Sequence, residues 1–496
     1  MIQARSIARR WRGRRLFLLL LFCLSVSVIG NPILSRATVV PLAITDEDIT
    51  IAIESRFLVD KSVEANFIDV DTKNGIVTLS GSIDNLLAKE RAGKIVESVR
   101  GVKALINAIQ VRPLHQPDDE TLQRRVIAAL ADDPAADSYE IVVDVDDGTV
   151  ILHGTVQSWQ EKFLSEEVAK SVSGVRDLTS QIIAKPATNR DDSEIEADIV
   201  RHLQSDVWVD EGLIGIMVEQ GRVTLTGTVG SLAEKQAAFG DAWVSGVTEV
   251  SVDRLKVEWW ARDRMLKDPA NAIVSTTEKE AAVRIALSYD PRLQKSDISV
   301  RVMDGTAILG GLVNNLATKQ AAENTARSTV GIWQVRNLIK VRPNSPYNDE
   351  ELEERVLHVL NHHPMIDRYD IKVSSRSGRI SLEGYVQSST EISQAVRTVA
   401  RVKGVTDIVN YLKIASPSNE KYDEEIWEEI RRSFWWDPRL YDMDITVTVD
   451  NGVTTLRGTV PSILEWRRAN SIAKEAGSSR VRNRLKVTYG PDFLSA

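Results

Sequence analysis

The sequence contains a single cysteine, Cys23, and this residue lies in an apolar segment near the N-terminus. Once export removes that segment, the protein can form no disulfide bond and can offer no cysteine to a metal ion. The chain also lacks a G-x-S-x-G nucleophile motif, a Ser/His/Asp order typical of hydrolases and a glycine-rich phosphate loop. The folded parts of the chain must therefore be held by their hydrophobic cores, and no sequence motif points to catalysis.

Acidic residues outnumber basic residues outside the N-terminal segment. The formal net charge of the 496 residues is −8, and residues 1–30 carry six arginines and no acidic residue, so the chain without them has a charge of −14. This balance argues against binding to nucleic acid and against long-range attraction to anionic lipid. The hydrophobic share of 43% and the charged share of 27% are ordinary for soluble folded protein.

The N-terminus resembles an export signal. Its arginines precede an apolar run of 14 residues, Leu16–Ile29, which is short for a membrane-spanning helix and typical of a signal-peptide core. A cleavage region could end at Gly30 or at Ala37, and the alternative is an uncleaved anchor in the inner membrane. Arg14 and Arg15 also resemble a twin-arginine signal. We interpret residues 1–37 as a signal peptide or N-terminal anchor and expect the rest of the chain to be exported.

Six copies of one unit make up the rest of the chain. Each copy has a turn glycine, a strand glycine six residues later, and a third glycine 19 or 20 residues after that. The turn glycines are Gly75, Gly148, Gly221, Gly305, Gly378 and Gly452. The strand glycines are Gly81, Gly154, Gly227, Gly311, Gly384 and Gly458. The third glycines are Gly101, Gly174, Gly246, Gly331, Gly404 and Gly477.

The turn and strand glycines predict a tight β-hairpin in each copy. In the second copy, Asp147-Gly148 supplies the positive-φ pair that a two-residue turn needs. Val150, Leu152, Gly154 and Val156 then alternate onto one apolar face. Because glycine on an apolar strand face usually marks a close neighbour, we expect a helix to pack against these strand glycines.

A helix is predicted on each side of the hairpin. The first has apolar residues four apart, as in Leu122/Val126/Leu130, and acidic residues crowd its start in most copies. Capping boxes predict the start of the second helix at Ser158, Ser231, Ser388 and Ser462. The third glycine fits its left-handed C-cap, and a last strand follows.

The predicted fold is α+β: a tandem array of six small two-layer α-β-β-α-β sandwiches, each of about 70 residues. The pattern leaves the strand order open. The predicted repeats are 45–113, 118–186, 192–257, 276–343, 348–414 and 422–489, with a longer linker at 258–275 between the third and fourth.

The repeating frame of acidic helix, D-G-x-V-x-L-x-G-x-V hairpin, S-x-x-E-K helix and V-x-N-x-L strand resembles the BON domain over residues 45–489. This family comprises bacterial osmotic-stress, nodulation and transport-associated envelope proteins. The resemblance implies a periplasmic, non-enzymatic module that binds phospholipid or other envelope components, without a cofactor. The fourth and sixth copies depart from the frame locally, at Lys279, Ala307, Gly310 and Ser478.

Histidines are the residues whose chemistry most invites a functional interpretation. His358, His362 and His363 have a spacing that can bind a metal, but we interpret them as a solvated helix end because no other copy has them. His153 lies mid-strand with no paired acid nearby in sequence, which indicates a half-exposed residue rather than a catalytic base. The sequence therefore predicts no enzyme, no metal site and no small-molecule substrate.

Paired tryptophans are the strongest candidates for a binding site. Trp259 and Trp260, with Arg262, lie in the longer linker, and Trp435 and Trp436 follow the first helix of the sixth copy. Trp suits a membrane interface or a protein contact, and the alternative is packing between repeats. We interpret the protein as a phospholipid-binding envelope protein for envelope maintenance or osmotic-stress protection. The alternative is a structural or adaptor array that binds an envelope protein or cell-wall polymer.

Overall fold

The structure is a computed structural model that describes residues 44–63, 67–132, 141–156, 159–185, 190–206, 209–263, 275–294, 296–343, 347–366, 369–415, 421–461 and 463–487. The predicted leader and the capping residues Ser158 and Ser462 lie outside these ranges.

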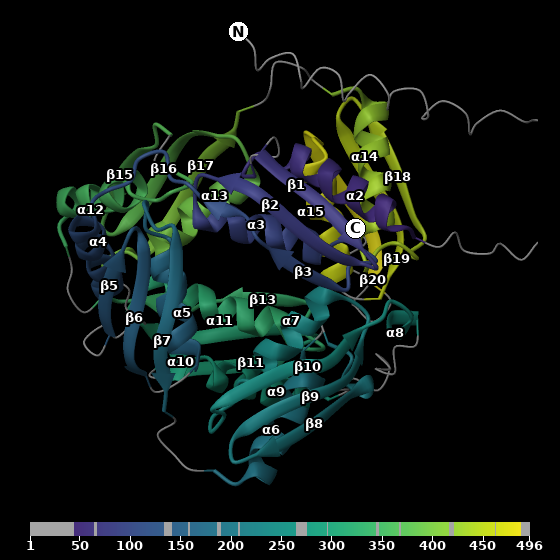
Figure 1. The fold of residues 1–496 in the computed structure, drawn as a ribbon, viewed down its shortest axis with the longest axis horizontal. Coiled ribbons are helices and arrows are strands. Elements are labelled where there is room, and N and C mark those ends of the chain that lie inside the picture. Colours follow the sequence, from purple (N-terminus) through teal and green to yellow (C-terminus); the bar gives the residue numbers. More distant parts are fainter. Residues whose placement is uncertain are drawn as a thin grey trace, which may run out of the picture. The chain divides into compact units, whose positions relative to one another are not determined.

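Each repeat follows the order helix, strand, strand, helix, strand (Figure 1). Repeat 1 comprises α2 (Asp46–Val59), β1 (Ile68–Lys73), β2 (Ile76–Ile83), α3 (Leu86–Glu97), β3 (Ala104–Asn107) and β4 (Gln110–Val111). Repeat 2 comprises α4 (Asp119–Asp132), β5 (Ile141–Asp146), β6 (Thr149–Val156), α5 (Trp159–Lys170) and β7 (Asp177–Ala184). Repeat 3 comprises α6 (Asp192–Ser205), β8 (Ile214–Glu219), β9 (Arg222–Val229), α7 (Leu232–Asp241) and β10 (Glu249–Val257).

The short helix α8 (Trp260–Asp263) follows, and the second three repeats keep the same order. Repeat 4 comprises α9 (Thr276–Tyr289), α10 (Pro291–Gln294), β11 (Ile298–Met303), β12 (Thr306–Val313), α11 (Leu316–Ser328), β13 (Gln334–Asn337) and β14 (Lys340–Val341). Repeat 5 comprises α12 (Asp349–Asn361), β15 (Lys372–Arg376), β16 (Arg379–Val386), α13 (Ser389–Ala400) and β17 (Asp407–Ile414). Repeat 6 comprises α14 (Asp423–Trp436), β18 (Ile445–Asp450), β19 (Val453–Val460), α15 (Ile463–Glu475) and β20 (Arg480–Val487).

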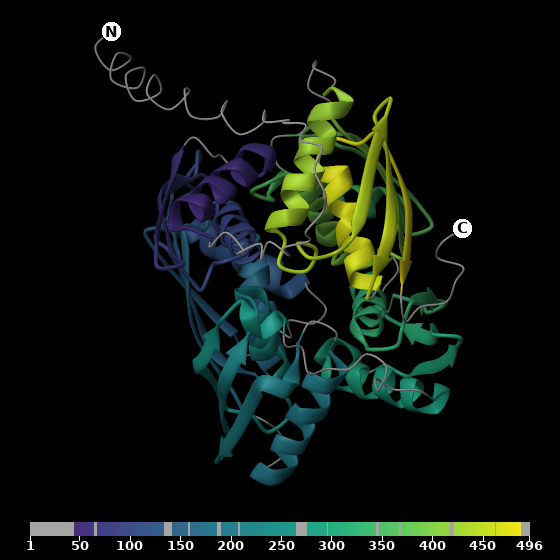
Figure 2. The same ribbon diagram turned by 90° about the vertical axis from the view of Figure 1, so that its right-hand side faces the viewer.

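The second strand is central in every sheet, which settles the strand order that the sequence left open. In repeat 6, β19 pairs antiparallel with β18 through the hairpin and parallel with β20. A parallel pair needs a crossover connection, and α15 supplies it. Both helices of the repeat therefore cover the same face of the sheet, as Figure 2 shows for α14 and α15.

The core of each repeat lies between this helical layer and the sheet. The apolar residues predicted to lie four apart on the first helix are buried, as in Leu122, Val126 and Leu130 of α4. On β6, Val150 and Leu152 are fully buried. The predicted α+β sandwich is thereby confirmed, and six cores without a disulfide hold the chain.

The hairpin turn is fixed from two sides. Both turn residues have positive φ in all six repeats, as in Asn451 (φ 50) and Gly452 (φ 72). In five repeats an aspartate in the first turn of the first helix accepts both turn N–H groups, at 2.7 to 3.3 Å. The turn glycine's carbonyl then accepts an N–H from just before the last strand, as in Ser479 to Gly452 at 2.9 Å. The first-turn aspartates thus bind the turn through charge-assisted hydrogen bonds, and they also interact favourably with the positive end of the helix dipole.

The expectation that a helix packs against the strand glycines is wrong. A Cβ on Gly458 would lie 2.2 Å from the backbone oxygen of Asp444, and Gly227 would meet Leu213 in the same way at 2.1 Å. The close neighbour is thus the start of the hairpin's own first strand. Gly458 also has φ 135, in a region that side chains rarely adopt. The glycine therefore lets the sheet bend at the end of the hairpin.

Helix capping is more widespread than predicted. The third glycine is left-handed in all six repeats, as predicted, with φ between 80 and 109. Ser388 and Glu391 form the predicted capping box, whereas the Glu234 carboxylate turns to the N–H groups of Gly230 and Asp210. Three first helices carry capping boxes that the sequence analysis missed, at Thr45, Ser275 and Asn348.

We predict that Gly458→Ala lowers the free energy of unfolding of repeat 6 by about 2–4 kcal/mol, because the Cβ meets backbone at a strained φ. Gly240→Ala is the matched control, since Gly240 is helical and its Cβ would meet nothing within 4 Å. The control should be neutral or gain up to about 1 kcal/mol. Urea unfolding of both variants checks this, and equal midpoints would contradict the geometric account.

We also predict that Thr276→Asp stabilises repeat 4 by about 1 kcal/mol. Thr276 occupies the helix position at which the other five repeats have the turn-binding aspartate. Thr277→Asp adds the same charge one residue later, where it cannot face the turn. Hydrogen exchange of the Gly305 amide should slow in the first variant alone, and slowing in both would assign the effect to helix charge.

Candidate functional site

The repeats dock on one another through one repeated backbone contact. In each case the N–H of the residue before a third glycine donates to a carbonyl at the C-terminal end of a first helix in another repeat. The bonds join repeats 1 and 6 (Arg100 to Trp436), repeats 2 and 5 (Ser173 to His362) and repeats 4 and 3 (Val330 to Ser205), each at 3.0 Å. Each docking site therefore brings the segment after a second helix against the end of a first helix from another repeat.

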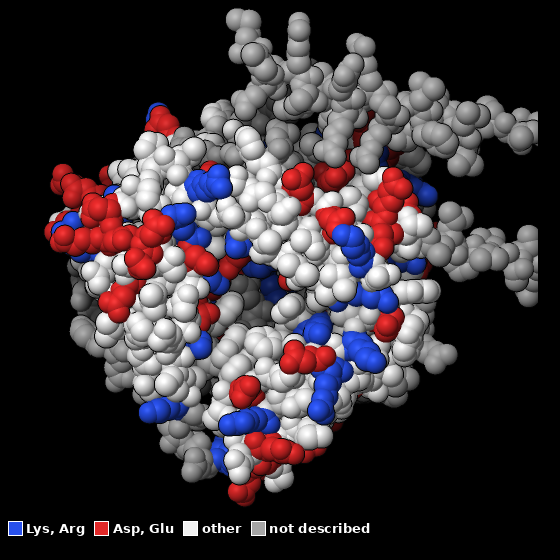
Figure 3. All heavy atoms as spheres, viewed as in Figure 1, with Lys and Arg blue, Asp and Glu red and all other residues white. Residues whose placement is uncertain are grey.

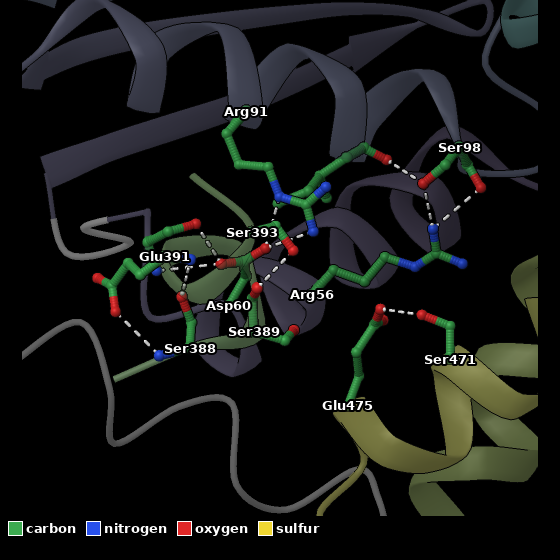
Figure 4. A network of polar contacts seen from close by, with 12 residues as sticks. Arg56, Asp60, Arg91, Ser98, Ser388, Ser389, Glu391, Ser393, Ser471 and Glu475 are labelled. Atoms are coloured by element: carbon green, nitrogen blue, oxygen red, sulfur yellow. Dashed lines mark hydrogen bonds and ion pairs between the residues drawn. The ribbon is translucent and has the colours of Figure 1, made fainter. Parts of the chain in front are cut away.

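The junction of repeats 1 and 6 is built around a largely buried arginine. Arg56 Nη1 donates to the Ser98 carbonyl at 2.9 Å and to Ser98 Oγ at 2.6 Å (Figure 4). Burial lowers the pKa of Arg56 to about 10, against the opposing effect of Asp437 and, more weakly, of Glu475 and Glu429. The guanidinium thus stays charged at neutral pH because acids from repeat 6 surround it.

A buried ion pair supports the same junction. Asp437, 2% exposed, accepts from Arg468 Nε at 2.7 Å and from the N–H of Arg439 at 3.0 Å. Burial alone would raise the pKa of Asp437, but Arg468 and the hydrogen bonds bring it below its ordinary value. In repeat 1 the corresponding pair is Asp60 and Arg91, also at 2.7 Å but more exposed.

The linker tryptophan Trp259 lies against this junction. Its ring is 5.9 Å from the guanidinium carbon of Arg100, which also lies 5.6 Å from the ring of Trp435 and 3.7 Å from that of Tyr441. The structure therefore brings two of the predicted site residues together around one cation. Trp259 therefore lies against residues of repeats 1 and 6, including Arg100 and Tyr441.

The remaining predicted site residues have different surroundings. Trp259 and Trp435 are 47% and 45% exposed and Trp260 is 38% exposed, so all three offer ring surface to solvent. Trp436 stacks edge-on to Trp435 and packs partly buried against the core of repeats 1–3. The Arg262 side chain lies outside the described residues. Whether any of these residues binds a ligand stays a prediction.

The site also includes Arg100 and Tyr441, which sequence reasoning missed. Arg100 occupies the variable position before a third glycine, and nothing in the repeat pattern distinguishes it. Beside it lies a hollow of only about 20 Å³. This volume is about that of one water molecule, so the cluster offers a surface rather than a pocket.

The histidine interpretation is wrong for His363. This residue is 2% exposed, and its Nδ1 accepts the N–H of Met365 at 3.2 Å. Aspartates in the equivalent position make the same bond, as Asp437 does to Arg439. His363 thus substitutes for a capping aspartate. Within the described ranges, no group of three or more potential ligands is arranged to hold a metal ion.

His153 is half-exposed, as expected, but it has an acidic neighbour on the adjacent strand that was not identified from the sequence. Its Nε2 lies 3.3 Å from Asp144 Oδ2 on the adjacent strand. An exposed pair of this kind contributes little to stability. Among the described residues, no helix combines the length and apolar character needed to cross a membrane.

We predict that Asp437→Asn lowers the free energy of unfolding by about 3–5 kcal/mol, because Arg468 and Arg56 lose their buried counter-charge. Asp60→Asn, at the more exposed pair, should cost less than half as much. Since the folded pKa of Asp437 is depressed, its contribution is present above the unfolded pKa of about 3.9 and fades as pH falls through the folded value. Urea midpoints of Asp437→Asn and the unmodified chain should therefore converge in acid; a constant gap would refute this assignment.

Comparison with known proteins places all six repeats in one family. The model of the BON domain matches residues 45–113, 118–186, 191–258, 275–343, 348–416 and 422–489. Osmotically-inducible protein Y of Escherichia coli (strain K12) is 27% identical over 146 residues, which cover 28% of this chain and 73% of that protein. A second relative, described as "Uncharacterized protein in gshII 5'region" of Anaplasma centrale, is 25% identical over 124 residues, covering 24% of this chain and 82% of its own.

Two solved structures of CdsD, a structural protein of the type III secretion system of Chlamydia trachomatis, are also similar. The C-terminal domain is 14% identical with a TM-score of 0.12, covering 39% of this chain and 89% of that chain. The second is 15% identical with a TM-score of 0.12, covering 45% and 99%.

Proposed function

This chain belongs to the BON domain family, and on that premise we propose that it is an exported, non-catalytic protein of the bacterial envelope that binds phospholipid surfaces. The osmotically inducible relative supports a role in osmotic stress or envelope maintenance. The arginine-rich start and short apolar run support export to the periplasm.

One observation carries the lipid assignment. Trp259 and Trp435, from distant parts of the chain, expose nearly half of their surface beside the cation Arg100. Aromatic rings next to a cation suit the headgroup region of a bilayer, where the ring is partly buried and the cation meets phosphate. Each ring could add about 1–2 kcal/mol through buried area.

Charge elsewhere on the protein limits the range of this attraction. Acidic side chains gather on the left in Figure 3, where Figure 1 labels α12 and α4. The first turns of these two helices carry Asp349, Glu350, Glu351, Asp119 and Glu120. Such a surface repels an anionic bilayer at low salt, while a contact within a Debye length responds only to local charge. Binding should therefore depend on the tryptophan cluster and tolerate salt.

A structural or adaptor role is the second candidate. The face of repeat 5's sheet that its helices leave open carries Tyr385 and Tyr411, which are 62% and 56% exposed. Exposed tyrosines on a strand face are typical of protein contacts. This observation favours an envelope protein or a cell-wall polymer as the partner.

We predict that Trp259→Ala/Trp435→Ala reduces flotation with vesicles of phosphatidylethanolamine and phosphatidylglycerol at least fivefold, because about 2–4 kcal/mol of ring burial is lost in part. Trp427→Ala is the control, since Trp427 is 38% exposed on α14 with Arg431 over its ring, away from Arg100. The melting curves of both variants should match the unmodified chain. Unchanged flotation with a lowered melting temperature would assign the tryptophans to packing and favour the adaptor role.

A further inference from the structure

The junction of repeats 2 and 5 contains a cavity of about 290 Å³ that opens to solvent. It lies between α4 and the end of α5 on one side and the end of α12 and α13 on the other. Its walls combine valine and alanine with a cationic and imidazole set: Arg124, Arg125, Arg401, His358, His362 and His363. Among the described residues that line it, none is acidic.

The cavity lies where the junction of repeats 1 and 6 is filled by Arg56. The equivalent of Arg56 in repeat 2, 73 residues later, is Ala129, and both Ala129 and the equivalent of Ser98, Ser171, line the cavity. In repeat 3 this position is His202, which is largely buried and whose Nδ1 lies 2.8 Å from the Asp241 carbonyl. Two junctions thus fill this space with a polar side chain, and the third leaves it open.

Charge is reversed in the same place. The acids of repeat 6 that surround Arg56 are Asp437, Glu475 and Glu429. The corresponding positions of repeat 5, 74 residues earlier, are His363, Arg401 and Arg355. One junction therefore has three acids around an arginine, while the other has two arginines and a histidine at those positions, and Arg401 and His363 line the cavity.

The local electrostatics suit a bound anion. Burial, with Arg401 and Arg397 as smaller causes, lowers the pKa of His363 to about 3, so this imidazole is neutral at physiological pH. Burial also lowers the pKa of Arg397, with Arg401 as a second cause, which reflects cations placed close together. Glu167 acts in the opposite direction on Arg397, and Glu120 pairs with Arg124 at 3.4 Å on the exposed side.

We propose that this cavity is a binding site for a small amphipathic anion, with a carboxylate or phosphate head and an apolar body of about ten carbons. The arginines receive the head, because guanidinium groups pair with both kinds of oxyanion. The valines and alanines receive the apolar body. The volume is about twice that of a cavity that holds benzene and lies near the lower limit of about 300 Å³ for ligand sites. This site is separate from the tryptophan surface and does not depend on its function.

Histidine signals test the site directly, because three of the six histidines in the chain line the cavity. The full chain, labelled with ¹³C-histidine, is titrated with decanoate or monodecyl phosphate below the micelle concentration. We expect saturable shifts of His358, His362 and His363, with His115, His153 and His202 unmoved. Decanol and decyltrimethylammonium should bind at least tenfold more weakly. Comparison of the two anions identifies the preferred head.

Substitutions then test the charge and the space separately. Arg125→Gln should weaken decanoate binding about tenfold, while Arg379→Gln, an exposed arginine at the edge of the same pair of repeats, should leave it unchanged. Ala129→Arg/Arg401→Glu restores the arginine and the acid that occupy these positions in the filled junction, Arg56 and Glu475, so it should fold and lose binding.

Three results would overturn the proposal. In the first, decanoate moves none of the three cavity histidines or moves all six signals alike. In the second, decanol binds as tightly as decanoate, which would leave an apolar void without anion recognition. In the third, the double variant retains a normal melting curve and binds decanoate like the unmodified chain.

Discussion

The hairpin turn, held by an aspartate of the preceding helix, is the contact on which the rest of each repeat depends. Its backbone is left-handed at both turn residues, a conformation that a free chain adopts rarely. The Asp423 carboxylate accepts hydrogen bonds from both turn N–H groups. The Gly452 carbonyl accepts one from the N–H of Ser479, just before the last strand. One turn therefore fixes the first helix, the hairpin and the third strand relative to one another. Where the aspartate is absent, in repeat 4, the sheet and both helices still form, because the core packs in the same way.

The contacts between repeats also rely on one recurring backbone interaction. Three junctions use one backbone hydrogen bond, which requires no particular side chain and so permits any chemistry around it. The side chains have then diverged. Arg56 and its acids fill one junction, His202 occupies a second, and the third keeps a cavity beside Arg401. A repeated scaffold with a sequence-independent contact can thus carry a different site at each junction, while the cores that hold the repeats remain alike.

Local features could be predicted from the sequence, and contacts between distant segments could not. The alternation of Val150 and Leu152 and the left-handed third glycines follow from rules that act within a few residues, and the structure agrees. The neighbour of Gly458 was predicted wrongly because a glycine in the pattern indicates a close contact but does not identify the atoms that make it. Arg100 and His363 were missed for a different reason. The rings around Arg100 belong to segments outside its own repeat, and His363 stands where other repeats have an aspartate. Neither relation produces a periodic pattern in the sequence. The prediction of tryptophans as a site identified exposed rings correctly, but not the cation that joins them.

The clamped turn also bears on the chemical ageing of the protein. Two of the six turns are Asn-Gly pairs, Asn74-Gly75 and Asn451-Gly452. Asparagine before glycine deamidates when the glycine nitrogen attacks the side-chain amide to form a succinimide ring. In the folded protein that nitrogen donates its hydrogen to a carboxylate, Asp46 at 2.9 Å or Asp423 at 2.7 Å, and the left-handed turn holds it in place. Deamidation at these positions therefore reports opening of the first or last repeat, and its extent after storage measures how often these two repeats unfold.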